Sequence, residues 1–305
     1  GMNELPEEIG LLTSLESLDL GSLSLESLPN SIGSVRMLKF LHASYNSFDT
    51  FPQAIYNLSA LEWLDLSYNK IAGTIDETLG SLSALRFLDL EANKLGGQIP
   101  ATLRHLSNLE YLYLGNNDLT GPIVGPLTTN LRHVRLELND LKFNVSLFLE
   151  ELPSLEYLDL ETNLVYGTLP FSIGTRTNLR VLKLSGNKIK GSIPSGIGNL
   201  SSMTVLHLSQ NELSGTIPAE LGKLPQLSTL AISTNTFDGT LPTTLGGLTS
   251  IVKFYAHGNR FTGTMPTELG RLKNIDHLDL SWNFLVGSVP NEVCLLENLK
   301  KLHVD

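Results

Sequence analysis

The sequence predicts an α/β repeat fold: a curved, twisted solenoid with a long parallel β-sheet on its concave face and short helices or 3₁₀ turns on its convex face. Two observations lead to this prediction. One apolar motif recurs along nearly the whole 305-residue chain, at offsets of about 22–24 residues. Within each repeat a short stretch alternates between leucine and other residues, as a half-buried strand does. A coil of this length cannot bury its own apolar side, so neighbouring coils must stack.

The recurring motif is Leu-x-x-Leu-x-Leu-x-x-Asn-x-Leu, and residues 85–95 show it in full. It begins at residues 15, 38, 61, 85, 109, 131, 155, 179, 203, 227, 251, 275 and 299. This spacing is the period of a leucine-rich repeat. We therefore expect a single leucine-rich repeat domain over residues 1–305, with about 12–13 repeats of 22–24 residues and partial repeats at both ends.

The ninth motif position predicts a ladder of buried side chains. Asparagine occupies it at Asn46, Asn69, Asn93, Asn117, Asn139, Asn163, Asn187, Asn211, Asn235, Asn259 and Asn283. An asparagine amide both donates and accepts hydrogen bonds, so it can satisfy the backbone of its own coil and of a neighbouring coil. We interpret the ladder as structural. The first coil has Leu23 at this position, so we expect that end to be irregular.

The second half of most repeats carries a Gly-x-Ile-Pro signature. It reads Gly191-Ser192-Ile193-Pro194 and Gly215-Thr216-Ile217-Pro218, and related versions follow. Over about residues 61–298 the chain thereby resembles the plant-type leucine-rich repeats of receptor kinases, receptor-like proteins and polygalacturonase-inhibiting proteins. This resemblance implies an extra short strand beside the main sheet. Residues 1–60 lack the glycine and look like the commoner 23-residue repeat, which also occurs in cytoplasmic proteins.

Two segments depart from the pattern. Between residues 109 and 131 the spacing shortens to 22 residues, with Gly121-Pro122 and Gly125-Pro126 close together. The next coil, residues 141–152, lacks the Gly-x-Ile-Pro signature and its apolar spacing is more helical. Irregular coils of this kind either shape a binding surface or record a tolerated local deletion. The sequence leaves both interpretations open.

Composition and short motifs limit which cellular compartment and which class of partner the chain is expected to have. Lysine and arginine total 21 against 31 acidic residues, a net charge of −10, which disfavours nucleic-acid binding. We expect no direct membrane insertion, because no apolar run is long enough to span a bilayer. The resemblance implies an extracellular or cell-surface location, with a cytoplasmic location as the alternative. A lone cysteine, Cys294, fits a buried thiol, whereas extracellular members of the resembled family usually end in a paired-cysteine cap. Asn57, Asn144 and Asn199 start possible N-glycosylation sites.

The outward-pointing strand residues form columns, because equivalent residues of successive coils are neighbours. One column places aromatic rings together in the first half of the chain, and the next two columns are rich in acids. The candidate ligand-binding residues are Phe40, Trp63, Phe87, Tyr111, His133 and Tyr157 in the first column, Asp65, Asp89, Tyr113, Arg135 and Asp159 in the second, and Glu91 and Glu161 in the third. Exposed aromatic patches tend to be interaction sites. Aromatic residues also favour strands and pack across them, which would make the column structural.

Catalysis and metal binding are poorly supported. Histidines lie in the strand columns, and Asp279 with His303 could form an acid–base pair, but no nucleophile motif or third partner accompanies them. We expect no enzyme activity, no metal and no cofactor. A row of hydroxyls at Thr168, Ser192, Thr216, Thr240, Thr264 and Ser288 is similar to the ordered rows of leucine-rich-repeat ice-binding proteins.

The sequence therefore predicts a non-catalytic recognition module that binds a protein or peptide ligand through the concave sheet, with a glycan as the other candidate ligand. It would be the ectodomain of a receptor-like or secreted protein. The alternatives are an ice-binding protein, an enzyme inhibitor and a cytoplasmic scaffold.

Overall fold

The structure, a computed structural model, describes residues 4–123, 125 and 127–304. Contacts within the chain group these residues into two compact units, Gly1–Phe143 and Asn144–Asp305. The single-domain organisation over residues 1–305 stays a prediction. Pro126, in the second Gly-Pro pair of the shortened repeat, lies outside the described residues.

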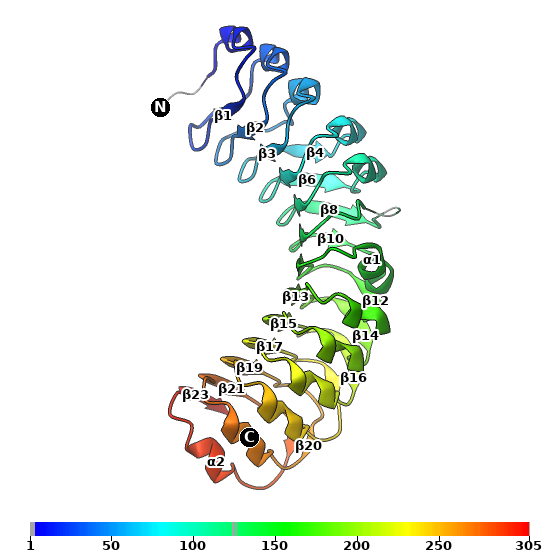
Figure 1. Ribbon diagram of the computed structural model, residues 1–305, viewed down its shortest axis with the longest axis vertical. Helices are drawn as coiled ribbons and strands as arrows, with labels where there is room; N and C mark the ends of the chain where they lie inside the picture. The colour runs from blue at the N-terminus through cyan, green and yellow to red at the C-terminus, as the bar shows by residue number, and fades with distance from the viewer. Residues whose placement is uncertain (1–3, 124, 126, 305) are drawn as a thin grey trace. The chain divides into compact units, whose positions relative to one another are not determined.

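In the first unit, one short strand from each repeat pairs in parallel with its neighbour (Figure 1). These strands are β1 (Ser17–Asp19), β2 (Phe40–His42), β3 (Trp63–Asp65), β5 (Phe87–Asp89), β7 (Tyr111–Tyr113) and β9 (His133–Arg135). The register places equivalent motif positions opposite one another, so that Leu64 pairs with Leu88 and Leu88 with Leu112. The predicted columns of outward residues are therefore present in this sheet.

Short 3₁₀ helices lie on the opposite side of the first unit from this sheet (Figure 1). They are η1 (Glu7–Leu11), η2 (Asn30–Ser34), η3 (Gln53–Asn57), η4 (Glu77–Ser81) and η5 (Ala101–His105). A second parallel sheet contains β4 (Ala72–Thr74), β6 (Lys94–Gly97), β8 (Asp118–Gly121) and β10 (Asp140–Leu141). This is the extra short strand that the plant-type signature implies. It begins at Ala72, after the residues that lack the signature.

The second unit repeats this arrangement. Its main sheet contains β11 (Tyr157–Asp159), β13 (Val181–Lys183), β15 (Val205–His207), β17 (Thr229–Ala231), β19 (Lys253–Tyr255), β21 (His277–Asp279) and β23 (Lys301–His303). The extra strands are β12 (Tyr166–Thr168), β14 (Lys188–Gly191), β16 (Glu212–Gly215) and β18 (Thr236–Phe237), with β20 (Thr262–Gly263) and β22 (Phe284–Leu285) as a separate pair. The helices are α1 (Val145–Glu151), η6 (Phe171–Thr175), η7 (Ser195–Asn199), η8 (Ala219–Lys223), η9 (Thr243–Gly247), η10 (Thr267–Arg271) and α2 (Asn291–Cys294). Helix α1 confirms the helical interpretation of the coil at residues 141–152.

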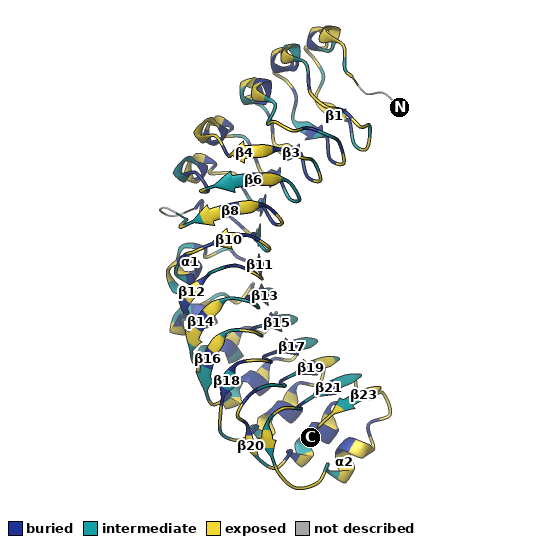
Figure 2. Cartoon of the chain, turned by 180° about the vertical axis from the view of Figure 1, so that it is seen from behind, coloured by how far each residue is buried: buried dark blue, intermediate teal, exposed yellow. Residues whose placement is uncertain are grey.

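The core of each unit lies between its main sheet and its helices. Motif leucines such as Leu64 and Leu206 are fully buried. Figure 2 colours buried residues dark blue and shows β4 as exposed along its whole length. Close stacking of the helices depends on a glycine in most of them. A Cβ at Gly222 of η8 would lie 2.0 Å from the backbone oxygen of Thr244 in η9, so a larger residue there would force the two coils apart.

The asparagine ladder ties successive coils together. Asn187 donates from Nδ2 to the backbone oxygens of Leu184 in its own coil and Leu160 in the preceding coil, at 3.1 and 2.8 Å. Its Oδ1 accepts from the backbone nitrogen of Val165, also in the preceding coil, at 2.9 Å. Asn69 and Asn259 make the same set of contacts. The structural interpretation of the ladder is consistent with this geometry.

The two ends of the chain differ from the middle repeats. Ser22 and Ser24 both have positive φ angles, whereas later coils have a single left-handed residue at the equivalent turn, so the first coil is irregular as expected. Cys294 is exposed, so the expectation of a buried thiol is wrong. It is the last residue of the short helix α2, which buries Val293 on its other side and turns the thiol outward.

Within the described residues, we found no helix with the length and apolarity that a bilayer crossing requires.

Candidate functional site

The first outward column of the first unit forms a continuous line of rings. Phe40, Trp63, Phe87, Tyr111 and His133 lie opposite one another in the strand register. The ring centroids of Trp63 and Phe87 are 3.5 Å apart and their planes differ by only 3°. Phe40 stacks on the other side of Trp63 at 5.7 Å, and Tyr111 lies at 4.9 Å from the His133 ring.

This stacking decides which part of each ring a ligand can reach. Trp63 is 37% exposed, but Phe87 is only 8% exposed because Trp63 covers one of its faces. Tyr113 approaches Phe87 edge-on, with centroids 5.3 Å apart. The facing surfaces of the Trp63 and Phe87 rings therefore cover each other and are closed to a ligand. A ligand on this surface meets mainly ring edges and the outer face of the column.

A shallow groove runs along one margin of the ring column. It has a volume of about 370 Å³ and is lined by Lys39, Phe40, Glu62, Trp63, Arg86, Phe87 and Tyr111. The two cations at its margin are held by acids, because Lys39 pairs with Glu16 at 2.7 Å and Arg86 with Glu110 at 2.6 Å. The groove thus has an aromatic floor and a polar margin, an arrangement suited to a side chain with an apolar body.

The second and third columns place acids beside the rings. Asp65 accepts hydrogen bonds from the backbone and hydroxyl of Ser67, and its other oxygen lies 3.6 Å from His42 Nε2. Asp89 accepts from the backbone nitrogen of Glu91 at 2.8 Å. These carboxylates lie on adjacent strands in register. The second column is therefore negative across β3 and β5.

One arginine lies at the far side of these acids. Arg135 pairs with Glu91 at 2.9 Å and with Glu137 at 2.6 Å, and its guanidinium carbon lies 5.4 Å from the centre of the Tyr113 ring. Each of these contacts holds the guanidinium in place. Arg135 therefore neutralises the third-column acids and forms no ion pair with Asp89 in the second column.

Burial makes the charge of Asp89 costly. Removal from water, opposed by the backbone hydrogen bond from Glu91 and reinforced by the charges of Asp65 and Glu91, raises the pKa of Asp89 to about 7. Arg135 acts in the opposite direction but is held by the glutamates. Ionised Asp89 is the least compensated charge of this surface, because burial weakens its hydration without supplying a cation.

The three remaining candidate residues lie in the second unit and belong to a separate network. Asp159 is 3% exposed and accepts from Lys183 Nζ at 2.9 Å, while the hydroxyl of Tyr157 donates to the same oxygen at 3.4 Å. Glu161 lies 3.1 Å from His207 Nδ1. All three side chains are engaged with neighbours. The structure thus provides Asp159 with an internal partner, and little of it is accessible to a ligand.

Sequence reasoning missed an exposed tyrosine pair at the edge of the first-unit sheet. Tyr45 and Tyr68 stack with centroids 4.4 Å apart and planes within 6°, and they are 57% and 44% exposed. Both have positive φ angles in the turn after their strands. The sequence contains a signal for this pair, because each tyrosine immediately precedes a ladder asparagine in consecutive repeats. The groove residues Lys39, Glu62 and Arg86 were missed in the same way, since they precede the ring column by one position.

Other candidates find less support. Asp279 lies 3.1 Å from His257 and 3.5 Å from His303, but no group of acids, histidines and cysteine in the described chain is arranged to hold a metal ion. The threonine row has a packing role: the methyl of Thr168 lies 3.1 Å from where a Cβ of Gly191 would be. The Thr168 methyl therefore packs close to Gly191 in the next coil.

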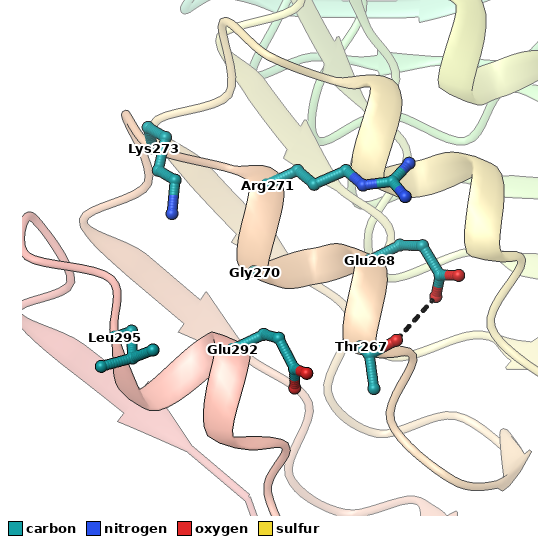
Figure 3. Close-up of a pocket in the computed structure, with 7 residues that line it drawn as sticks. All are labelled: Thr267, Glu268, Gly270, Arg271, Lys273, Glu292 and Leu295. Atoms are coloured by element: carbon teal, nitrogen blue, oxygen red, sulfur yellow. Dashed lines mark hydrogen bonds between the residues drawn. The ribbon is translucent and has the colours of Figure 1, made fainter.

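A hollow on the helical side of the second unit has a different character. It lies between η10 and α2, with Thr267, Glu268, Gly270, Arg271, Lys273, Glu292 and Leu295 around it (Figure 3). Its lining mixes charges of both signs and has no ring. The sheet face of the first unit, with the groove and acids described above, remains the stronger candidate site.

Comparison with known proteins identifies the repeats. The model of a leucine-rich repeat region matches residues 1–121 and 171–304. Among solved structures, the chain is similar to the plant peptide hormone receptor RGFR1, solved with RGF2, at 32% identity and a TM-score of 0.87. It is similar to a TDR receptor at 32% identity and a TM-score of 0.92, and to the Arabidopsis receptor kinase HAESA, solved with the peptide hormone IDA and the co-receptor SERK1, at 28% and 0.76.

Each of these alignments covers 99% of the present chain. The chain spans only about half the length of the receptor structures, 53% of RGFR1 and of the TDR receptor and 59% of HAESA. No curated protein matches at a significant level. The motif spacing, the paired strand ladders and the matched family model agree. The chain belongs to the leucine-rich repeat family, and its repeats are of the plant receptor type.

Proposed function

We propose that the chain is a non-catalytic recognition module that binds a peptide or an extended protein segment on the sheet face of its first unit. The observation that carries this proposal is the aromatic groove of Phe40, Trp63, Phe87 and Tyr111, with acids in the adjacent column. Interaction hot spots favour large aromatic side chains beside polar partners. The similarity to RGFR1, which is described as a peptide hormone receptor, supports a peptide as the ligand.

The ring geometry favours a peptide over a glycan. Sugars bind aromatic side chains by lying flat on ring faces, and the facing surfaces of Trp63 and Phe87 are occupied by one another. Aliphatic and aromatic side chains can pack against ring edges, where the electrostatic potential of the ring is positive. A peptide also offers main-chain groups and charged side chains for the acids of β3 and β5.

An extracellular or cell-surface location is part of this proposal, supported by the receptor-like relatives. Asn57 and Asn199 are exposed, whereas Asn144 caps helix α1 by accepting from the backbone nitrogen of Ser146. We therefore expect glycans at Asn57 and Asn199 in protein secreted from a eukaryotic host. Intact-mass and peptide mapping would show them, and a host-secreted protein without glycans at either site would count against this location.

Selection from a displayed library of random short peptides tests the proposed function directly. Peptides enriched on the wild-type chain are synthesised, and their affinities for Trp63→Ala, Tyr111→Ala and Thr229→Ala are measured. We expect the first two substitutions to weaken binding roughly thirtyfold or more, because a lost aromatic hot spot costs about 2 kcal/mol. Thr229→Ala changes the same column in the second unit and should leave the affinity unaltered.

The controls separate loss of contact from loss of fold. The thermal midpoint and circular dichroism of each variant should match the wild type, and Tyr111→Ala provides a second readout if Trp63→Ala is unstable. Enriched peptides that bind all folded variants equally would place the binding surface elsewhere and defeat the proposal.

A further inference from the structure

The motif position of Asp89 carries an aspartate in several other repeats, and those aspartates have a lysine or histidine side chain as a neighbour. Asp19 lies 2.8 Å from His42 Nδ1, and Asp65 lies 3.6 Å from His42 Nε2. In the second unit, the equivalent residues Asp159 and Asp279 are served by Lys183 at 2.9 Å and by His257 at 3.1 Å. In these repeats the carboxylate is therefore paired with a lysine or histidine nitrogen from a neighbouring repeat.

Asp89 departs from this pairing. The strand after it supplies Tyr113 at the paired position, and the strand before it supplies Asp65, a second acid. Within the described chain, no lysine, arginine or histidine nitrogen lies within 4.0 Å of the Asp89 carboxylate. Arg135 is the nearest strongly basic influence, but it forms its short contacts with Glu91 and Glu137.

The groove lies next to this uncompensated charge. Trp63 and Asp65 are two residues apart on β3, as are Phe87 and Asp89 on β5, so each ring and its acid point to the same face about 6–7 Å apart. An extended peptide spaces alternate side chains by the same distance. One ligand segment can therefore reach both the aromatic groove and the acids.

We propose that this surface recognises a peptide segment in which an arginine or lysine side chain lies within two residues of a large apolar side chain. The apolar side chain occupies the groove of Phe40, Trp63, Phe87 and Tyr111. The cation lies between Asp65 and Asp89 and takes the place that Lys183 has beside Asp159. This inference rests on the proposed function, and it names the chemistry of the ligand.

The charge of the surface agrees with such a ligand. The outward acids Asp65, Asp89, Glu91 and Glu137 outnumber Arg135, and burial raises the pKa of Asp89 by more than Arg135 lowers it. A basic side chain from the ligand would lower that pKa again by direct charge pairing. Charge complementarity of this kind selects basic partners and excludes acidic ones.

The test uses peptides enriched from the displayed random library on the full chain. We expect the enriched sequences to contain arginine or lysine within two residues of an apolar residue more often than the starting library does. Replacing that arginine by citrulline, or that lysine by norleucine, should weaken binding roughly tenfold to a hundredfold, because a charge-assisted hydrogen bond is lost. Asp89→Asn should weaken the basic peptide by a similar factor.

Matched variants assign the effect. Asp279→Asn removes the equivalent aspartate in the second unit and should leave affinity unchanged. With Asp89→Asn, the citrulline peptide should bind as it does to the wild type, since the cation and its carboxylate act as one pair. Equal losses for both peptides would indicate a general disturbance of the surface and would overturn the pairing.

Two failures can be told apart. Peptides without basic residues that still need Trp63 would disprove the basic-side-chain inference and leave the proposed function standing. Recovery of no peptide whose binding depends on Trp63 would overturn both. Selection of acidic peptides would also contradict the inference, because the same four carboxylates would repel them.

Discussion

Lys183 and Asp159 form an ion pair across adjacent strands of the second unit, with Nζ 2.9 Å from Oδ2. Burial alone would lower the pKa of Lys183, but the hydrogen bond and charge of Asp159 raise it above its usual range. The pair shows what the repeat does with a buried strand aspartate. At Asp89 the same position has no cation, and that difference between two repeats is the basis for the proposed ligand chemistry.

The first prediction concerns this pair. Lys183→Met should lower the free energy of unfolding by about 3 kcal/mol, because the 3%-exposed Asp159 would lose its counter-ion and hold an uncompensated charge. Denaturant titration at neutral pH measures the change. Lys188→Met removes an exposed lysine in the same repeat and should have little effect. Equal midpoints for the two variants would show that Asp159 does not depend on Lys183.

The second prediction concerns Asp89 and pH. The pKa of Asp89 is about 7 in the folded chain and near 3.8 when unfolded, so the folded state binds the proton more tightly. The contribution of Asp89 to stability is therefore present at low pH and is lost as pH rises from about 4 through 7. Asp89→Asn should be more stable than the wild type by up to about 4 kcal/mol at pH 8, and nearly equal to it at pH 4.

Urea titrations across this pH range check the Asp89 prediction. Asp140→Asn changes an exposed aspartate at the start of β10 and provides the control. A difference between Asp89→Asn and the wild type that does not grow with pH would mean that the ionised carboxylate is compensated in solution.

The third prediction concerns the ladder. Asn187→Leu should destabilise the chain by about 1–3 kcal/mol, because the backbone groups of Leu160, Leu184 and Val165 would lose their buried partner. Thermal unfolding followed by circular dichroism measures this. Asn178→Leu, at an exposed position before β13, should be neutral. If both substitutions are neutral, the ladder does not support the fold.

The fourth prediction concerns the stacking of the helices. Gly222→Ala should cost about 1–3 kcal/mol, because the added methyl would overlap the backbone oxygen of Thr244 and push η8 from η9. Lys223→Ala, the next residue and exposed, should be tolerated. Hydrogen exchange would add a local readout, since a strained contact should increase exchange in residues 219–248 first. If Gly222→Ala leaves the exchange rates of these residues unchanged, the two coils can accommodate the added methyl without loss of stability.

Much of this fold could be predicted because the repeat is periodic. The spacing gives the strand register and the ladder positions. The resemblance carried by the Gly-x-Ile-Pro signature implies the second strand, and the apolar pattern of residues 141–152 indicates the helical coil. The candidate site was harder to predict, because a column position gives the direction of a side chain but does not show which neighbouring side chains cover it. Phe87 points outward as expected but is buried by the ring of Trp63.

Charge pairing was also not predicted from the sequence. Asp89 and Asp159 occupy the same motif position, and only the residue at the paired position of the following strand, tyrosine in one case and lysine in the other, distinguishes them. That comparison needs the register across strands, which the sequence could have supplied once the columns were drawn. Whether Cys294 is buried depends on the rotation of a four-residue helix, which no period determines.

The direction of the asparagine contacts has a consequence for how such chains change over generations. The side chain of Asn187 bonds to its own coil and to the one before it, while its backbone nitrogen donates to Gln210 in the coil after it. A whole coil can therefore be duplicated or removed by recombination and still find its bonding partners, and the shortened repeat before residue 131 keeps its ladder contacts through Asn139. The outward residues of a strand can then change one coil at a time, and with them the chemistry of the sheet face, while the inward residues that form the core stay the same.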